Sequence, residues 1–220
     1  MRGREGLMTL EARRGALSRL AQLGLGAIPW GLWPMQSAIA GRQIEEPLSH
    51  AVRTALSAAV AGHAPPEPMF STDPERQAHA QWLSACSARL ARFTPHPTDR
   101  QEFLQTLWYE ARRAGLSLSL VLGLVQVESG FRKYAVSSVG AVGYMQIMPF
   151  WARLIGDGDE ARLFHMQTNL RFGCVILRHL LDREQGDAFM GLGRYNGSRG
   201  QSAYPNAVMT AQQQWRRQVD

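Results

Sequence analysis

An almost unbroken apolar run from Leu120 to Val127 constrains the fold of this chain more than any other segment. A helix made from this run carries apolar side chains on nearly every side, and such helices are buried in the core of a protein. Glu128 ends the run, and residues 132–148 contain too many Gly, Ser and Val residues to continue as a long helix. We therefore expect a central buried helix followed by a structured loop with short strands.

Helix-length segments elsewhere place the 220-residue chain in the mainly α class. Few segments alternate between apolar and polar residues as strands do. Start and stop signals include a Thr98–Gln101 capping box, Gly115 as a helix end, Ser117 or Ser119 as the cap of the buried helix, and Pro149 as the start of a short helix. The other expected helices lie at 44–61, 76–93, 98–115, 149–155, from 167 or 168 onward, 187–198 and 204–219.

The first 40 residues resemble an export signal. Arg13 and Arg14 precede a moderately apolar stretch from Leu20 to Trp33, and a signal peptidase could cut the small-residue pattern after Ala40. The paired arginines are also typical of twin-arginine signals. The alternative is an uncleaved amphipathic helix or a membrane anchor, but the stretch is short and interrupted for a membrane span. We expect residues 1–40 to direct export to the periplasm.

The remaining chain divides at a proline-containing break at residues 94–98. Residues 41–97 hold two helical segments and a Pro-rich linker, and we expect this extension to brace the rest or to bind a cell-wall protein partner. Residues 98–220 form the expected main domain. Cys86 and Cys174 could form a disulfide in an exported protein, but we favour the interpretation that they are two small buried residues.

Charge and motif content exclude several classes of function. The formal net charge is +6, but the arginines are scattered and Lys133 is the only lysine, so the clustered basic stripe of a nucleic-acid binder is missing. No HExxH, GxSxG, P-loop or GxGxxG motif occurs in the sequence. We expect a monomer that binds no metal, cofactor or nucleic acid.

Glu128 is the strongest candidate for chemistry. On a helix it shares a face with Val121, Leu124 and Val125, where a carboxylate is poorly solvated. Desolvation disfavours the anion and raises its pKa, and a carboxyl group that stays protonated near neutral pH suits general acid catalysis on a glycosidic bond. The alternative is a carboxylate at the helix end that is exposed or paired with Arg132.

Residues around and beyond the loop match the needs of a carbohydrate groove. Gly140 and Gly143 allow the backbone to approach a ligand closely. Gln146 sits between apolar neighbours, and Tyr195 and Asn196 end a later helix. Amide and hydroxyl groups beside aromatic faces supply the donors, acceptors and stacking surfaces that sugars use.

Several of these residues lie in motifs of a known family. In order, the motifs are Glu128-Ser129, Ser137, GAVGYMQIMP at 140–149, Asn169 with Gly173, Tyr195-Asn196-Gly197 and Tyr204-Pro205. Together they resemble the lytic transglycosylase (SLT) domain of the lysozyme-like superfamily. The resemblance spans roughly residues 98–210 and implies a goose-type, lysozyme-like helical domain with a short β-like segment.

This resemblance implies cleavage of the MurNAc–GlcNAc β-1,4 bond in peptidoglycan glycan strands without water. Glu128 would be the single acid and base, which protonates the leaving oxygen and then deprotonates the C6 hydroxyl to close a 1,6-anhydro ring. Ser137 would bind the acetamido group, and Tyr195 would lie near Glu128 and orient it or the substrate. The implied substrate-binding residues are Ser137, Gly143, Met145, Gln146, Met148, Tyr195 and Asn196.

Three departures from the family pattern concern the rim of the groove. Tyr144 stands in place of a common Leu, Arg194 stands in place of Ala, and Ser198 follows Asn-Gly where the family has Asn-Ala-Gly-Pro. These changes bear on substrate length or peptide preference more than on the acid.

Two other functions use the same scaffold. One is a lysozyme-type hydrolase, which a water-activating second carboxylate would favour, with Asp157, Asp159 and Glu160 as the candidates. A non-enzymatic glycan-binding module is the other, but such a module would have no need of Glu128.

Overall fold

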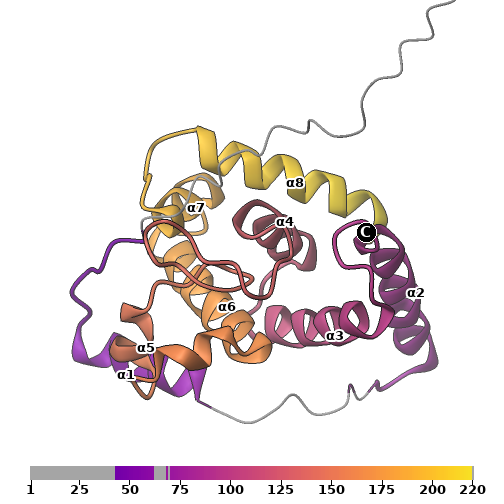
Figure 1. Ribbon diagram of the computed structural model, residues 1–220, viewed down its shortest axis with the longest axis horizontal. Coiled ribbons are helices and arrows are strands. Elements are labelled where there is room, and N and C mark those ends of the chain that lie inside the picture. The colour runs from indigo at the N-terminus through magenta and orange to yellow at the C-terminus, as the bar shows by residue number, and fades with distance from the viewer. Residues whose placement is uncertain (1–42, 62–67, 69, 220) are drawn as a thin grey trace, which may run out of the picture. The chain divides into compact units, whose positions relative to one another are not determined.

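The computed structural model describes residues 43–61, 68 and 70–219, with side chains described as far as residue 216. The predicted signal segment 1–40 lies outside these residues. The helices are α1 (His50–Val60), α2 (Asp73–Leu90), α3 (Pro97–Arg113), α4 (Leu118–Glu128), α5 (Phe150–Ile155), the 3-10 helix η1 (Glu160–Phe164), α6 (Met166–Arg183), α7 (Ala188–Asn196) and α8 (Ala203–Val219) (Figure 1). The prediction of a mainly α protein is confirmed.

The loop between α4 and α5 holds the β structure of the described residues. It consists of two isolated antiparallel bridges, which pair Val136 with Val142 and Val142 with Ile147. The expected short strands are therefore reduced to single bridges, because turns at Gly140 and Gly143 reverse the chain every few residues.

Helix α4 is buried, as its apolar sequence predicts. Leu122, Leu124 and Val125 are fully shielded from solvent. The helix packs along α8, and Gly123 makes the close approach possible because a Cβ there would lie 2.6 Å from the backbone nitrogen of Gln212. The apolar run is thus sandwiched at the centre of the helices, and its last residue is carried into the core.

Helix ends follow the expected signals in part. Ser117 Oγ accepts a hydrogen bond from the backbone N–H of Leu120, and α7 ends at Gly197 in the left-handed conformation, as predicted. The prediction that Thr98 caps α3 in a capping box with Gln101 is wrong, because α3 already begins at Pro97. The fixed φ of proline and its missing N–H suit the first helical position.

The two N-terminal helices differ from their predicted bounds. Helix α1 begins only at His50, where Ser49 caps it, instead of at residue 44. Helix α2 begins at Asp73, capped by Thr72, and ends at Leu90 instead of Phe93. Both corrections come from hydroxyl caps that the apolar periodicity did not reveal.

Cys86 and Cys174 are free thiols in the core, so the disulfide alternative is wrong. Each side chain is completely buried. Burial raises the pKa of the Cys86 thiol to about 12 and that of Cys174 further. Both thiols are therefore packing groups, as the favoured interpretation had it.

The segment before α1 lies against the later helices. Gln43 Oε1 accepts a hydrogen bond from the indole N–H of Trp151 at 3.0 Å, and Gln43 is buried. Glu46 forms ion pairs with Arg183 and with Arg194. Residues outside the predicted main domain thus satisfy polar groups on α5, α6 and α7. Within the described ranges, no helix combines the length and apolarity needed to cross a membrane.

Candidate active site

Glu128 is the last residue of α4, and only 3% of its surface is exposed. Burial raises the pKa of its carboxyl group to about 8. Arg132 does not pair with it, since Arg132 Nε donates to the carbonyl oxygen of Ser129. The alternative of an exposed or Arg132-paired carboxylate is therefore wrong, and the raised pKa favours the protonated form at neutral pH.

Tyr204, in the first turn of α8, is the direct partner of Glu128. Its Oη donates a hydrogen bond to Glu128 Oε1 at 2.5 Å. This hydrogen bond favours the carboxylate and lowers the pKa of Glu128, but the opposing effect of burial is larger. Burial and the Glu128 charge raise the pKa of Tyr204 well above its usual value, so the phenol remains a donor.

Sequence reasoning placed Tyr204 only in the closing motif of the resemblance and gave it no role at the site. The residue is 76 positions from Glu128, so no local pattern connects the two. The available signal was the position of an aromatic hydroxyl at the start of a helix that follows the Tyr195 motif.

Tyr195 lies close to Glu128 without bonding to it. The Glu128 charge contributes, after burial, to raising the pKa of Tyr195 well above its usual range. Its Oη donates to the carbonyl oxygen of Met145 at 2.8 Å. Tyr195 thus ties α7 to the loop, while Tyr204 holds the carboxyl group.

Asn169 on α6 anchors the loop that faces this region. Its Oδ1 accepts from the Met145 N–H at 2.8 Å, and its Nδ2 donates to the carbonyls of Val142 (2.9 Å) and Leu163 (2.8 Å). Gly143 has φ +78°, and a Cβ there would lie 2.2 Å from Asn169 Nδ2. Asn169 therefore fixes the loop only because position 143 is glycine.

Replacing Asn169 with Asp is expected to lower the free energy of unfolding by about 3 kcal/mol at pH 7. Aspartate keeps the shape but loses the two donors to Val142 and Leu163, and it adds a buried charge. Urea unfolding measures the effect, with Asn206→Asp on the exposed side of α8 as the matched control. Equal stabilities of the two variants would contradict this account of the loop.

Two residues that were predicted to line the groove make their contacts within the loop or with the helix beneath it. Gln146 is 3% exposed, has φ +50°, and donates through Nε2 to the carbonyls of Gly143 (2.9 Å) and Ala135 (3.2 Å). Met145 is completely buried and packs on Gly173, where a Cβ would lie 2.2 Å from the Met145 sulfur. In this conformation both residues shape the loop.

Ser137 and Asn196 offer unused hydrogen-bonding capacity. Ser137 Oγ accepts from the N–H groups of Val139 (3.3 Å) and Ala141 (3.0 Å), which leaves its own O–H to donate. Asn196 Nδ2 donates to Ser198 Oγ, whereas its buried Oδ1 has no hydrogen-bond partner within the described ranges. Met148 is half-buried.

The three candidate second carboxylates lie on an exposed segment and have other partners. Asp157 pairs with Arg162, Glu160 pairs with Arg153, and Asp159 caps η1 by accepting from the Ala161 N–H at 3.0 Å. No carboxylate among the described residues shifts the pKa of Glu128. In the same part of the chain, no three His, Cys, Asp or Glu side chains cluster as metal ligands.

Replacing Tyr204 with Phe is expected to raise the pKa of Glu128 further above 8, because the variant lacks the hydrogen bond that favours the carboxylate. A ¹³C NMR titration of the Glu128 carboxyl carbon, compared between the natural protein and the variant, measures the shift. An unshifted midpoint would contradict the assignment of Tyr204.

Comparison with known proteins supports one family. The profile of the Transglycosylase SLT domain family matches residues 106–217, which is 112 of the 220 residues. The chain belongs to this family, and through it to the lysozyme-like superfamily. The resemblance found in the motifs is thereby confirmed.

Relatives share only part of their length with this chain. Membrane-bound lytic murein transglycosylase C of Actinobacillus pleuropneumoniae serotype 5b (strain L20) is 37% identical over 90 residues, which cover 37% of this chain and 25% of the relative. The transglycosylase of Enterobacteria phage PRD1 is 32% identical over 115 residues, or 49% of this chain and 42% of the phage protein. Lytic transglycosylase Slt from Pseudomonas aeruginosa, solved as an inactive mutant, superposes with a TM-score of 0.42 at 19% identity and covers 82% of this chain and 36% of its own.

Proposed function

We propose that this protein is a peptidoglycan lytic transglycosylase that cleaves the MurNAc–GlcNAc β-1,4 bond without water and uses Glu128 as its single acid and base. The observation that carries the proposal is the buried Glu128 carboxyl group, whose pKa of about 8 keeps the proton available at neutral pH. The names of the relatives, lytic murein transglycosylases, support the same reaction and substrate.

The first step breaks the glycosidic bond. The O–H of Glu128 protonates the glycosidic oxygen as the bond from that oxygen to C1 of MurNAc breaks. The acetamido carbonyl oxygen of the same sugar bonds to C1, and the free O–H of Ser137 donates to this group and orients it. Glu128 is left as a carboxylate, which the Tyr204 hydroxyl stabilises.

The second step closes the ring. The Glu128 carboxylate accepts the proton of the C6 hydroxyl, O6 bonds to C1, and the acetamido oxygen leaves C1. Glu128 is again protonated, so the cycle balances without water and without a second carboxylate. Hydrolysis by a pair of carboxylates requires a partner for Glu128, and the local ion pairs of Asp157 and Glu160 give it no support.

The remaining site residues have positioning roles in this proposal. Tyr195, Gly143, Met145 and Gln146 hold the loop, which supports Ser137 at the required place. The half-buried Met148 contacts the glycan, and Asn196 holds the end of α7 through its hydrogen bond to Ser198 Oγ. The extension braces α5, α6 and α7 through Gln43 and Glu46.

We also propose that the protein acts in the cell envelope after export. The signal-like residues 1–40 support this location, and so does the description of relatives as membrane-bound.

Mass spectrometry of purified peptidoglycan digested by the full chain tests the reaction. We expect soluble muropeptides that are lighter by one water than their hydrolysed counterparts, because a 1,6-anhydro ring replaces the reducing end. Products with ordinary reducing ends would show that water attacks C1 and would overturn the non-hydrolytic mechanism.

A further inference from the structure

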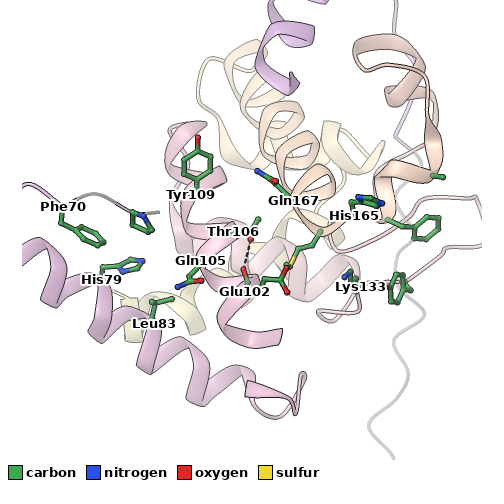
Figure 2. A pocket seen from close by; sticks show the side chains of 15 residues that line it. Phe70, His79, Leu83, Glu102, Gln105, Thr106, Tyr109, Lys133, His165 and Gln167 are labelled. Atoms are coloured by element: carbon green, nitrogen blue, oxygen red, sulfur yellow. Dashed lines mark hydrogen bonds between the residues drawn. The ribbon is translucent and has the colours of Figure 1, made fainter. Parts of the chain in front are cut away.

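A second feature of the described residues is a large groove. It encloses about 1070 Å³, and its floor is formed by α3 through Glu102, Gln105 and Tyr109. Figure 2 shows Phe70 and His79 on one side of this floor and Lys133, His165 and Gln167 on the other. None of the residues assigned to the Glu128 site lines it. We call it the α2–α3 groove.

This groove is made by two parts of the chain. Phe70, His79 and Leu83 come from residues before the SLT match at 106–217, whereas Tyr134 and Phe164 come from within it. The N-terminal extension, residues 41–97, therefore contributes one side of this groove. The segment that matches the SLT family would leave that side open on its own.

The size and lining of the α2–α3 groove fit an extended polar ligand. Its volume exceeds the roughly 300–1,000 Å³ typical of small-molecule sites. Tyr134 is 70% exposed, and its ring centroid lies 6.4 Å from that of Phe164. The exposed ring of Tyr134 beside the half-buried ring of Phe164 offers an aromatic surface that can stack on the apolar C–H faces of sugar rings.

Polar groups on the floor are available to such a ligand. The side chains of Glu102, Gln105 and Tyr109 engage in no hydrogen bond or ion pair with another group in the described part of the chain. Together they supply an acceptor, an amide with both donors and an acceptor, and a phenolic hydroxyl. This combination matches the hydroxyl and acetamido groups of a glycan.

The lining carries charges of both signs, so it suits a strand with widely spaced carboxylates, such as the one lactyl group per MurNAc of a peptide-free glycan, better than a dense polyion. Glu102 and Lys133 are opposite in sign, and burial lowers the pKa of His79, which keeps that imidazole neutral. A polyanion such as nucleic acid would require a basic stripe. The lining also has no uniform electrostatic potential that would attract an acidic or a basic peptide.

We propose that the α2–α3 groove is a second glycan-binding site, which holds a stretch of peptidoglycan strand while Glu128 acts elsewhere on the polymer. The inference rests on the proposed function for its substrate class. Two sites on one polymer raise the effective concentration of the strand at each site. Loss of the groove should therefore weaken binding of long strands and leave cleavage of short ones unchanged.

Binding of peptide-free glycan strands to the full chain tests the proposal, measured by cosedimentation in the inactive Glu128→Gln background. The Tyr134→Ala and Gln105→Ala substitutions together are expected to weaken binding of long strands roughly tenfold, because they remove one stacking face and one amide. The control carries Val136→Ala, an exposed residue of the same loop outside the groove, and Gln213→Ala on α8. Circular dichroism and melting curves check that all variants fold.

Unchanged binding by the groove variant, or an equal loss in the control variant, would overturn the proposal. Tight binding of the soluble stem peptide in place of the peptide-free glycan would also overturn it. Because the readout is binding by an inactive variant, it is independent of product chemistry. Hydrolytic products in the mass spectrum would contradict the transglycosylase mechanism, but they would not affect the conclusion that the α2–α3 groove binds glycan.

Discussion

Replacing Glu128 with Gln is expected to reduce peptidoglycan solubilisation by about a thousandfold, because general acid–base catalysis of this kind contributes roughly 10²–10⁴ in rate. Glutamine has the same shape and can still accept the hydrogen bond from Tyr204. It cannot give a proton to the leaving oxygen or take one from the C6 hydroxyl. A turbidity assay on purified peptidoglycan, read over hours, measures the loss.

The three exposed carboxylates supply the matched controls for this result. Asp157→Asn, Asp159→Asn and Glu160→Gln should each retain lysis within about twofold, because these side chains act in surface ion pairs and a helix cap. Retained lysis by Glu128→Gln, or abolished lysis by one of the three, would contradict the single-carboxylate account. Binding of glycan strands by Glu128→Gln should remain intact.

The same substitution is expected to stabilise the protein at neutral and alkaline pH. The folded pKa of Glu128 is about 8 and the unfolded value is near 4.5, so between these pH values the unfolded chain ionises and the folded chain does not. Stability of the natural protein therefore falls as pH rises from 4.5 to about 8. Removing the carboxyl group removes this penalty, which is about 5 kcal/mol above pH 8.

Urea unfolding of the natural protein and Glu128→Gln at pH 4.5, 6 and 8 measures the effect. The stability difference should be near zero at the lowest pH and should grow toward the highest. Glu184 provides a control of opposite sign, because Arg199 and Arg194 lower its pKa to about 2. Glu184→Gln should lose stability at neutral pH, and this loss should vanish as pH falls toward 2. A pH-independent difference for Glu128→Gln would show that its carboxyl group is ionised in the folded state.

The sequence was informative where a local pattern determines the structure. The apolar run identified α4 and the burial of Glu128, because a helix with apolar residues on every side has no solvated face. Ser117, Gly115 and Gly197 marked helix ends correctly, since caps act within a few residues. The motif order also identified the family.

Contacts between residues that are distant in the sequence could not be predicted from local patterns. Tyr204 meets Glu128 across 76 positions, and Gln43 reaches Trp151 across 108. Gln146 was predicted to line the groove because it is a polar amide between apolar neighbours, and the sequence did not reveal that its Nε2 donates to the loop carbonyls of Gly143 and Ala135. In each case the packing of separate helices, and not local propensity, determines the partner.

The pKa of Glu128 itself tests the central claim most directly. A ¹³C NMR titration of the glutamate carboxyl carbons, with the Glu128 signal assigned by its absence in Glu128→Gln, gives this value without any substrate. We predict a midpoint of about 8. A midpoint near 4.5, the ordinary value for glutamate, would mean that Glu128 is a carboxylate at neutral pH and would contradict its role as the proton donor.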